Sequence, residues 1–441
     1  MKKQMVKSLL LVSSLTALGL MLTARADDAP ALPLEKAVPA TWYDLTLELI
    51  RHTPGYAPPV ASRTLGYLGV GLYEALVPDF KGYQSLTGQL NGFTKIPKRI
   101  AGKTYDTATI ENAVLSSLVK HFFDNTGPSG LQAVGNLEKR MKQSLESRDI
   151  PKDVMERSRN HGRRVADAIF EWSKTDGGAN GAHAGYPQTF TPPQGPNYWV
   201  SLVPTQSRPL LPYWGDNRPM ALKTGDECKL VAPPEYSEKT DSTFYKEALE
   251  VYTISKNRTE EQTAIARFWS DDAMLSKTPP GHWVGLLTQL LAEKNSSLET
   301  YAEGYARLGI AVNDAFIGCW KTKYEYNLLR PVTYIKRLID PKWESMLTTP
   351  PFPEYPSGHS TQSGAAAEVL TQLFGDNQTF TDHTHDEDGM PERSFSSFHA
   401  AANEAALSRL YGGIHYRSAV ERGLEQGKCI GEKVTKLQFK R

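Results

Sequence analysis

Residues 356–374 read PSGHSTQSGAAAEVLTQLF, a turn followed by a run with helical composition. Pro356 cannot lie inside a helix and Ser357 is a good N-cap, so His359 is predicted in the first turn of a new helix. The backbone N–H groups of a first turn lack intrahelical partners and carry a partial positive charge. The stretch therefore indicates an imidazole beside a site for phosphate or another oxyanion, with a plain helix start as the alternative.

A second motif upstream supplies two cations. Lys323 and Arg330 stand seven residues apart in KYEYNLLRP, residues 323–331. Seven residues make two helical turns, so both side chains are predicted on one face of a helix. Two cations on one face favour an anionic ligand.

A third motif downstream combines an arginine with a second histidine. Arg409 and His415 lie in LSRLYGGIHYRSAVERG, residues 407–423. On an unbroken helix these side chains would point about 120° apart. The Gly412-Gly413 pair between them lets the chain bend, so both are predicted to reach one pocket.

Taken together, K-x6-R-P, PSGH and S-R-x5-H resemble the three-part signature of the type 2 phosphatidic acid phosphatases and the vanadium-dependent haloperoxidases. The resemblance covers about residues 300–430, and the N-terminal half has only a general likeness to exported bacterial haloperoxidases. By the family pattern, His359 would be the acid–base residue, His415 would bond the central atom, and Lys323 would join them as a catalytic residue. The resemblance implies that the oxyanion is held by Lys323, Arg330, Ser357, Gly358 and Arg409.

The central atom decides the chemistry. With phosphorus, His415 would be a nucleophile that forms a phosphohistidine; with vanadium, it would be a lasting ligand. The phosphatases normally have Asp four residues after this histidine, where this chain has Ala419, and Glu421 lies off the face of His415. Because a metal-ligating histidine can donate to a backbone carbonyl instead, the missing carboxylate favours vanadate.

Two aromatic residues have positions that flank the halide side of vanadate in some haloperoxidases. They are Trp320, three residues before Lys323, and Phe352, seven before His359. The resemblance implies an aromatic wall there. Ordinary core packing is the alternative.

The first 26 residues have the pattern of a secretory signal. Lys2, Lys3 and Lys7 precede an apolar run, and Ala24-Arg25-Ala26 offers a cleavage site. The mature protein is therefore predicted to be periplasmic or secreted. Later apolar runs are too short for a membrane span, so none is predicted.

Residues 27–441 are predicted to form a single all-α catalytic domain, because no linker or charge block divides them. The 50 Lys and Arg against 49 Asp and Glu give no reason to expect nucleic acid or an acidic membrane as a partner. Cys228, Cys319 and Cys429 permit at most one intramolecular disulfide, whose pairing stays open, and leave one thiol that is expected to be buried.

Apolar residues at three- and four-residue spacing predict a mainly helical chain. The expected helices are 41–53, 60–77, 105–124, 129–147, 152–174, 243–256, 259–272, 283–294, 298–329, 357–374 and a pattern over 395–439. The family fold implied is an arrangement of two helix bundles. Residues 177–242, rich in Gly, Pro and aromatic side chains, are predicted to form an ordered wrap over the bundle that lines the pocket mouth.

Other histidines carry no recognisable partner pattern. Residues 383–388 (HTHDED) have metal-ligand types without the spacing of a calcium or zinc motif, so a solvated loop is predicted. Ordinary structural roles are predicted for His52, His121, His161, His183, His282 and His399.

The sequence thus predicts a vanadate-dependent haloperoxidase that oxidises halide, iodide before bromide, with hydrogen peroxide and passes the product to a small organic acceptor. The first alternative is a soluble exported acid phosphatase acting through His415. The second is a phosphate-binding protein without catalysis, which would have no use for His359 as an acid–base group.

Overall fold

The computed structural model describes residues 32–202 and 207–441, and the predicted signal segment 1–26 lies outside them. Within that range the fold is all-α, as predicted, apart from an antiparallel pair of short strands. The N-terminal helices are α2 (Leu34–His52), α3 (Pro58–Leu76), α4 (Thr107–Phe122), α5 (Gly127–Glu146) and α6 (Lys152–Ser173). The later elements are α7 (Thr243–Lys256), α8 (Glu260–Phe268), α9 (Thr278–Glu293), α10 (Leu298–Tyr326), α11 (Pro331–Leu338), α12 (Gly358–Phe374), β1 (Phe380–Asp382), β2 (Arg393–Phe395), α13 (Phe398–Tyr411) and α14 (Arg417–Thr435). None of these described helices is long and apolar enough to cross a membrane.

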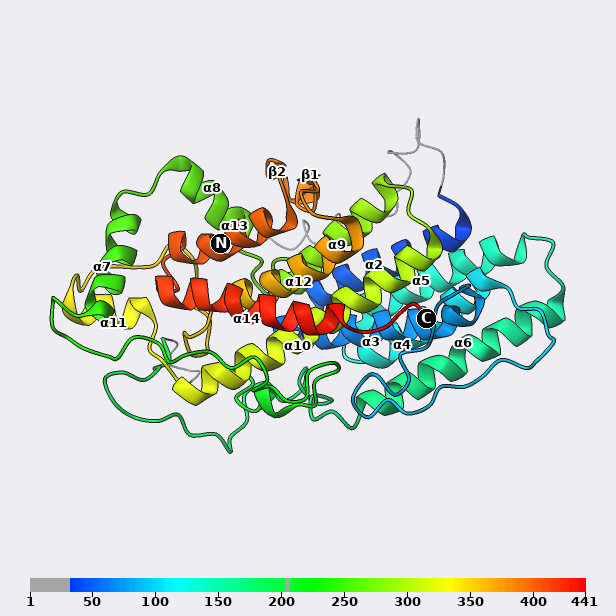
Figure 1. Cartoon of the computed structure of the whole chain (residues 1–441), viewed down its shortest axis with the longest axis horizontal. Coiled ribbons are helices and arrows are strands. Elements are labelled where there is room, and N and C mark those ends of the chain that lie inside the picture. Colours follow the sequence, from blue (N-terminus) through cyan, green and yellow to red (C-terminus); the bar gives the residue numbers. More distant parts are fainter. Residues whose placement is uncertain (1–31, 203–206) are drawn as a thin grey trace, which may run out of the picture.

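Helix α10 connects the two helical groups. Its residues from Tyr301 to Trp320 are buried without a break, as expected of a helix surrounded by others. It packs against α3 on one side and α12 on the other. Figure 1 shows α2–α6 at one end of the elongated molecule and α7, α8 and α11 at the other, with α10 and α12 between them.

Several helix bounds differ from the predictions: α2 begins at Leu34 and not at 41, and α10 ends at Tyr326 and not at 329. Helix α8 ends at Phe268 and not at 272: Trp269 already leaves helical backbone with φ −93° and ψ 17°, and Asp271 beyond it is left-handed with φ 46°. The 395–439 pattern divides into α13 and α14 at the turn that holds Gly413, with φ 80°. Helix α11 was not predicted, and the chain turns into it after Asn327, again left-handed.

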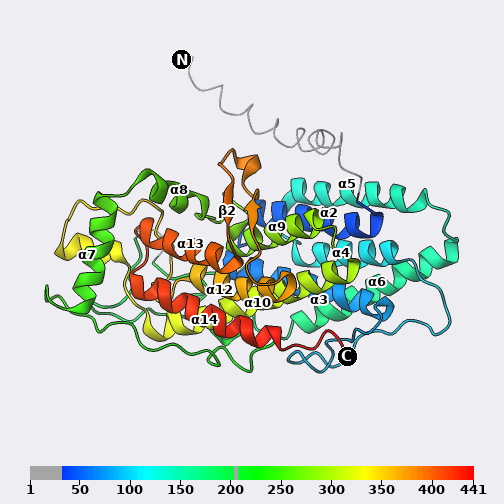
Figure 2. The ribbon, with the colours of Figure 1, turned by 45° about the horizontal axis from the view of Figure 1, so that its top comes forward.

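A glycine seam, Gly423, Gly427 and Gly431, lies where α14 packs on α12. A Cβ at Gly427 would lie 2.1 Å from the Thr361 carbonyl oxygen, and one at Gly423 would lie 2.6 Å from Ser360 Cβ. The two helices therefore approach to near backbone contact. Figure 2 shows α14, α12 and α13 side by side.

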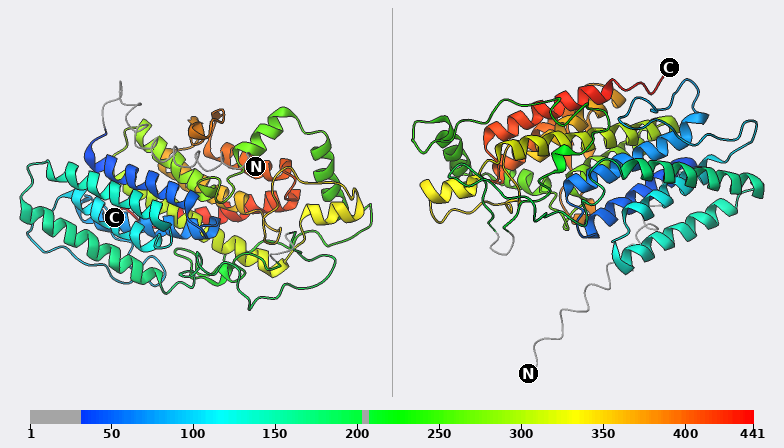
Figure 3. Two further views of the ribbon diagram at one scale, coloured as in Figure 1. Left: turned by 180° about the vertical axis from the view of Figure 1, so that it is seen from behind. Right: turned by 90° about the horizontal axis from the view of Figure 1, so that it is seen from below.

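The segment between α6 and α7 runs as irregular coil along the outside of α10 (Figure 3). Its short 3-10 turn, η2 (Trp214–Asp216), packs against α10, and Gly181–Gly185 and Leu210 line the pocket described below, as predicted for a wrap. Cys228 at its far end forms a disulfide with Cys429 of α14, while Cys319 is free and buried.

Candidate active site

The PSGH turn begins α12 as predicted. Ser357 is the N-cap, and its Oγ accepts a hydrogen bond from the Ser360 backbone N–H at 3.3 Å. The Ser357 backbone N–H donates to the Ala419 carbonyl of α14 at 3.0 Å. His359 therefore lies in the first turn, held beside the start of the last helix.

Lys323 and Arg330 do not share a helix face, so that prediction is wrong. Helix α10 ends at Tyr326, and Arg330 is the residue before α11. The left-handed Asn327 turns the chain between them. The two cations lie close together because both donate hydrogen bonds to backbone carbonyls of the same loop, residues 352–356.

The Lys323 ammonium donates all of its hydrogen bonds to that loop. Its Nζ donates to the carbonyl oxygens of Pro353 at 3.0 Å and Glu354 at 2.9 Å, and also to that of Pro356. An ammonium has three N–H donors, so all are used. In this arrangement Lys323 positions the PSGH turn, and its role as a direct oxyanion ligand stays a prediction.

Arg330 and Arg409 each hold one of the two histidines. Arg330 Nη1 lies 3.1 Å from His415 Nε2 and donates to the Ile414 carbonyl at 2.9 Å. Arg409 Nη1 lies 3.1 Å from His359 Nε2. The bend at Gly413 thus brings the second and third motifs into one pocket, as the glycine pair predicted.

His415 has a carboxylate partner that sequence reasoning missed. Its Nδ1 lies 2.7 Å from Glu354 Oε1, which also accepts from the Tyr416 backbone N–H at 2.9 Å. The inference from Ala419 that this histidine lacks a carboxylate is therefore wrong. Glu354 lies 61 positions before His415, so no helical spacing rule relates the two residues. The sequence feature that could have indicated a buried carboxylate is the acidic residue inside the otherwise uncharged run PPFPEYP.

The contacts of His415 fix its tautomer. A guanidinium can only donate, so Nε2 accepts from Arg330 and Nδ1 carries the proton given to Glu354. Burial, with Arg330 and Lys323 nearby, holds the pKa of His415 well below its usual range. The neutral ring therefore has its Nε2 lone pair on Arg330 Nη1 beside the pocket, a contact that a ligand bound to Nε2 would replace.

Several buried donors are left for a ligand. Among residues 32–202 and 207–441, Arg330 Nη2, Arg409 Nη2 and Ser360 Oγ have no hydrogen-bond partner. Burial lowers the pKa of Lys323 to about 7 and the pKa of each of these arginines to about 10. Burial thus destabilises the three positive charges, and a bound anion would stabilise them. Two guanidinium groups beside a helix N-terminus and an imidazole lone pair fit a tetrahedral oxyanion such as vanadate or phosphate.

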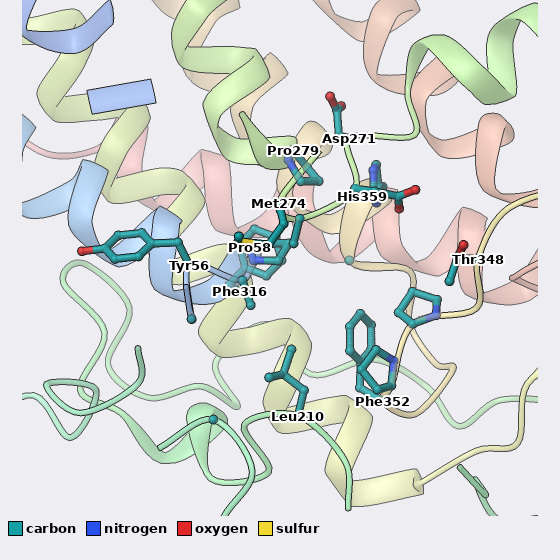
Figure 4. Close-up of a pocket in the computed structure, with 18 of the residues that line it drawn as sticks. Tyr56, Pro58, Leu210, Asp271, Met274, Pro279, Phe316, Thr348, Phe352 and His359 are labelled. Atoms are coloured by element: carbon teal, nitrogen blue, oxygen red, sulfur yellow. The ribbon is translucent and has the colours of Figure 1, made fainter. Parts of the chain in front are cut away.

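The pocket has a volume of about 540 Å³ and is open to solvent. His359, Arg409 and His415 line it, and so do Trp320 and Phe352, whose ring centroids are 4.9 Å apart. Figure 4 shows Phe352 and Leu210 on the opposite side of the pocket from Asp271. The two aromatic residues proposed for the halide side thus form one apolar wall. Three of the predicted oxyanion residues, Lys323, Arg330 and Ser357, are not part of the pocket lining and lie behind it.

The HTHDED loop is not fully solvated, so that prediction is wrong for one residue. His385 is 7% exposed, and its Nε2 lies 3.5 Å from Asp271 Oδ1. His282, predicted to be an ordinary structural histidine, is also buried and lies between Asp271 and Asp382. Asp271 lines the pocket, so this second cluster adjoins the candidate active site.

Comparison with known proteins identifies the family. A family model described as the second helical-bundle domain of VCPO matches residues 304–440. The crystal structure of a bacterial vanadium-dependent iodoperoxidase superposes with a TM-score of 0.83 at 37% sequence identity, covering 94% of this chain and 99% of that one. This chain belongs to the vanadium-dependent haloperoxidase family.

Other members of the family are more distant. A vanadium chloroperoxidase of Curvularia inaequalis is 25% identical over 403 residues, which cover 76% of this chain but 65% of that longer relative. A vanadium-dependent bromoperoxidase of Ascophyllum nodosum is 36% identical over 94 residues, 19% of this chain and 17% of the relative. A holo-type bacterial vanadium-dependent chloroperoxidase shares the fold, with a TM-score of 0.66 at 14% identity over 88% of this chain and 93% of that one. Membership of the family implies a vanadate cofactor, and the donor set above fits it.

Proposed function

We propose that this protein is a vanadate-dependent haloperoxidase that oxidises halide with hydrogen peroxide to a hypohalous species, with iodide as the preferred halide. The observation that carries the proposal is that His415 and Arg409 line one pocket, that Arg330 behind its surface contacts His415 Nε2, and that each arginine has an unpartnered Nη2 group. The likeness to a bacterial iodoperoxidase over nearly the whole chain supports the choice of vanadate and iodide. Vanadate, when bound, activates hydrogen peroxide toward halide while vanadium keeps its oxidation state.

The protein residues have separate tasks in this proposal. His415 Nε2 bonds the vanadium, and Glu354 keeps the ring in the required tautomer. Arg330 and Arg409 donate their Nη2 groups to the oxyanion. The Ser357 hydroxyl and the Gly358 amide complete the set of donors at the start of α12.

His359 is proposed to accept a proton from hydrogen peroxide. Burial and the neighbouring Arg409 hold the pKa of His359 well below its usual range, so the ring is neutral near pH 7. A neutral imidazole can receive a proton, which an imidazolium cannot. Arg409 Nη1 donates to Nε2 at 3.1 Å in this structure, so proton transfer to Nε2 would require the peroxide to replace this contact.

Export from the cytoplasm is part of the proposal. The Cys228–Cys429 disulfide supports it, since such bonds persist in oxidising compartments.

The first prediction tests the cofactor. Chelator-treated protein incubated with orthovanadate is expected to oxidise iodide with hydrogen peroxide, and protein without vanadate is expected to have background activity. Excess phosphate should compete, because it needs the same donors. Steady-state iodide oxidation together with vanadium analysis checks this. Full activity in protein shown to be free of vanadium would refute the proposal.

A specific observation favours a second candidate, an acid phosphatase. The carboxylate of Glu354 on His415 Nδ1 resembles the partner that orients a nucleophilic histidine in a catalytic triad. Hydrolysis of p-nitrophenyl phosphate by vanadate-free protein separates the two functions. A phosphatase would be inhibited by the vanadate that activates a haloperoxidase.

The second prediction concerns the aromatic wall. Phe352→Leu is expected to change the ratio of kcat/KM for iodide to that for bromide by several-fold, because the apolar wall governs the hydration of the reacting oxygen. Vanadate affinity should change less, although the Phe352 ring lies 5.1 Å from the Arg330 guanidinium carbon. Steady-state kinetics with both halides measure the ratio. Phe80→Leu, a buried ring outside the pocket lining, is the control, and an unchanged ratio in Phe352→Leu would assign that residue to core packing.

A further inference from the structure

Asp271, His282 and His385 form a buried group whose nearest side-chain ligand atoms lie within 4.8 Å of one another. Asp271 Oδ2 is 3.0 Å from His282 Nδ1, and Asp271 Oδ1 is 3.5 Å from His385 Nε2. The three residues come from the loop after α8, from α9 and from the HTHDED loop. The fold thus brings together one carboxylate and two imidazoles that are distant in sequence.

Each imidazole is oriented by a second carboxylate on its other nitrogen. His282 Nε2 lies 2.8 Å from Asp382 Oδ2, and His385 Nδ1 lies 3.0 Å from Asp388 Oδ2. A carboxylate that accepts N–H from one ring nitrogen leaves the other nitrogen free to bind a metal. Both free nitrogens then face Asp271.

Two atoms of the group lack hydrogen-bond partners. In the described part of the chain, Asp271 Oδ1 and His385 Nε2 are buried and make no hydrogen bond, although they face each other. Asp271 is 3% exposed and His385 is 7% exposed. A second proton on His282 would satisfy Asp271 Oδ2, and one on His385 would point toward Asp271 Oδ1 at 3.5 Å, which is long for a hydrogen bond. An ion between the three residues would satisfy all of them.

The local charge balance also favours a divalent cation. The group contains three carboxylates, those of Asp271, Asp382 and Asp388. One guanidinium, that of Arg51, forms an ion pair with Asp388 at 3.0 Å. Burial disfavours a protonated ring here, but Asp271 and Asp382 outweigh it and raise the pKa of His282 to about 10, so a bound cation would take the place of ring protons beside these three carboxylates. Stacking of Trp269 on His282, with ring centroids 4.5 Å apart, keeps the group dry and strengthens its electrostatic interactions.

From this geometry we propose that Asp271, His282 and His385 bind a Zn²⁺ ion. Two imidazoles, one carboxylate and an open fourth position make up a common zinc ligand set. The proposal does not depend on the haloperoxidase function, because its ligands are separate from those proposed for vanadate.

The ion would anchor the loop 269–272 beside the candidate active site. In that loop the Trp269 carbonyl accepts a hydrogen bond from the His359 ring, and the Ser270 carbonyl accepts one from Arg409 Nη1 at 3.2 Å. Asp271 lies between these contacts and the proposed zinc. The metal would therefore fix the backbone that holds two residues of the pocket.

The third prediction tests the zinc site by metal content. Chelator-treated full-length protein, incubated with ZnCl₂ and desalted, is expected to retain one zinc per chain and to gain thermal stability. His385→Ala is expected to lose the zinc. His383→Ala is the matched control, since His383 lies two residues away in the same loop with its side chain 37% exposed, and it should retain one zinc.

A second measurement guards against a variant that misfolds. Co²⁺ in place of Zn²⁺ should give the visible absorption of a tetrahedral site in the parent protein. Asp388→Asn, which leaves all three ligands in place, should weaken Co²⁺ binding about 10–100-fold, as expected for the partner of a ligating histidine. Retention of less than about a tenth of a zinc per chain by the parent, or equal retention by His385→Ala, would overturn the proposal.

Discussion

His415→Ala is expected to leave the protein without bound vanadium, whereas His359→Ala is expected to keep vanadium and lose about 10²–10⁴-fold in kcat. The difference arises because one imidazole is proposed as the ligand and the other as the proton acceptor. The Glu354 contact on Nδ1 leaves Nε2 of His415 as the unprotonated ring nitrogen on the pocket side. Vanadium analysis after desalting, with steady-state iodide oxidation, separates binding from turnover.

The comparison needs a variant that alters neither role. His399→Ala serves, because His399 is on the surface with its side chain 49% exposed. Its vanadium content and kcat should match those of the parent. Thermal unfolding of each vanadate-free variant excludes misfolding as the cause of lost metal. Normal vanadate binding by His415→Ala, or full activity of His359→Ala, would show that the roles are wrongly assigned.

Glu354 should matter for vanadate affinity although it does not line the pocket. Glu354→Ala is expected to weaken vanadate binding by about 100-fold and Glu354→Gln by about 10-fold, the range found for the partners of ligating histidines. The glutamine oxygen can still accept from His415 Nδ1 and from the Tyr416 amide, so it preserves orientation while removing a carboxyl whose pKa burial raises to about 8. Equilibrium dialysis with orthovanadate measures both constants.

A matched variant distinguishes positioning from general damage. Glu247 accepts hydrogen bonds from Ser418 and lies outside the pocket lining, so Glu247→Gln should bind vanadate as the parent does. A further readout is the pH dependence of vanadate binding, which should differ between the parent and Glu354→Gln because glutamine cannot titrate. Identical affinities in the parent and Glu354→Ala would refute the positioning role.

Local rules predicted the parts of the site that depend on neighbouring residues. Pro356 and Ser357 fix the start of α12, and the glycine at 413 fixes the bend that brings His415 to the pocket. The seven-residue spacing of Lys323 and Arg330 predicts one helix face, but the left-handed Asn327 ends α10 between them. The same two residues still meet, through a loop that neither belongs to.

Contacts between distant segments were beyond prediction from the sequence. Glu354 reaches His415 across 61 positions, and His385 reaches Asp271 across more than a hundred. Both depend on where packed helices place loops, and neither leaves a periodic pattern. The domain boundaries and the roles of the oxyanion residues stay predictions, while the all-α fold and the family are confirmed.

The glycine seam between α12 and α14 limits how this half of the protein can vary during evolution. An alanine at Gly427 would place its methyl group 2.1 Å from the Thr361 carbonyl oxygen of α12, the helix that begins with the PSGH turn. Positions on the opposite face of α14, such as Glu425 and Lys428, are exposed and carry no such restriction. Side chains can therefore be added at low cost on the outer face of the last helix, but not at the three glycines of the seam.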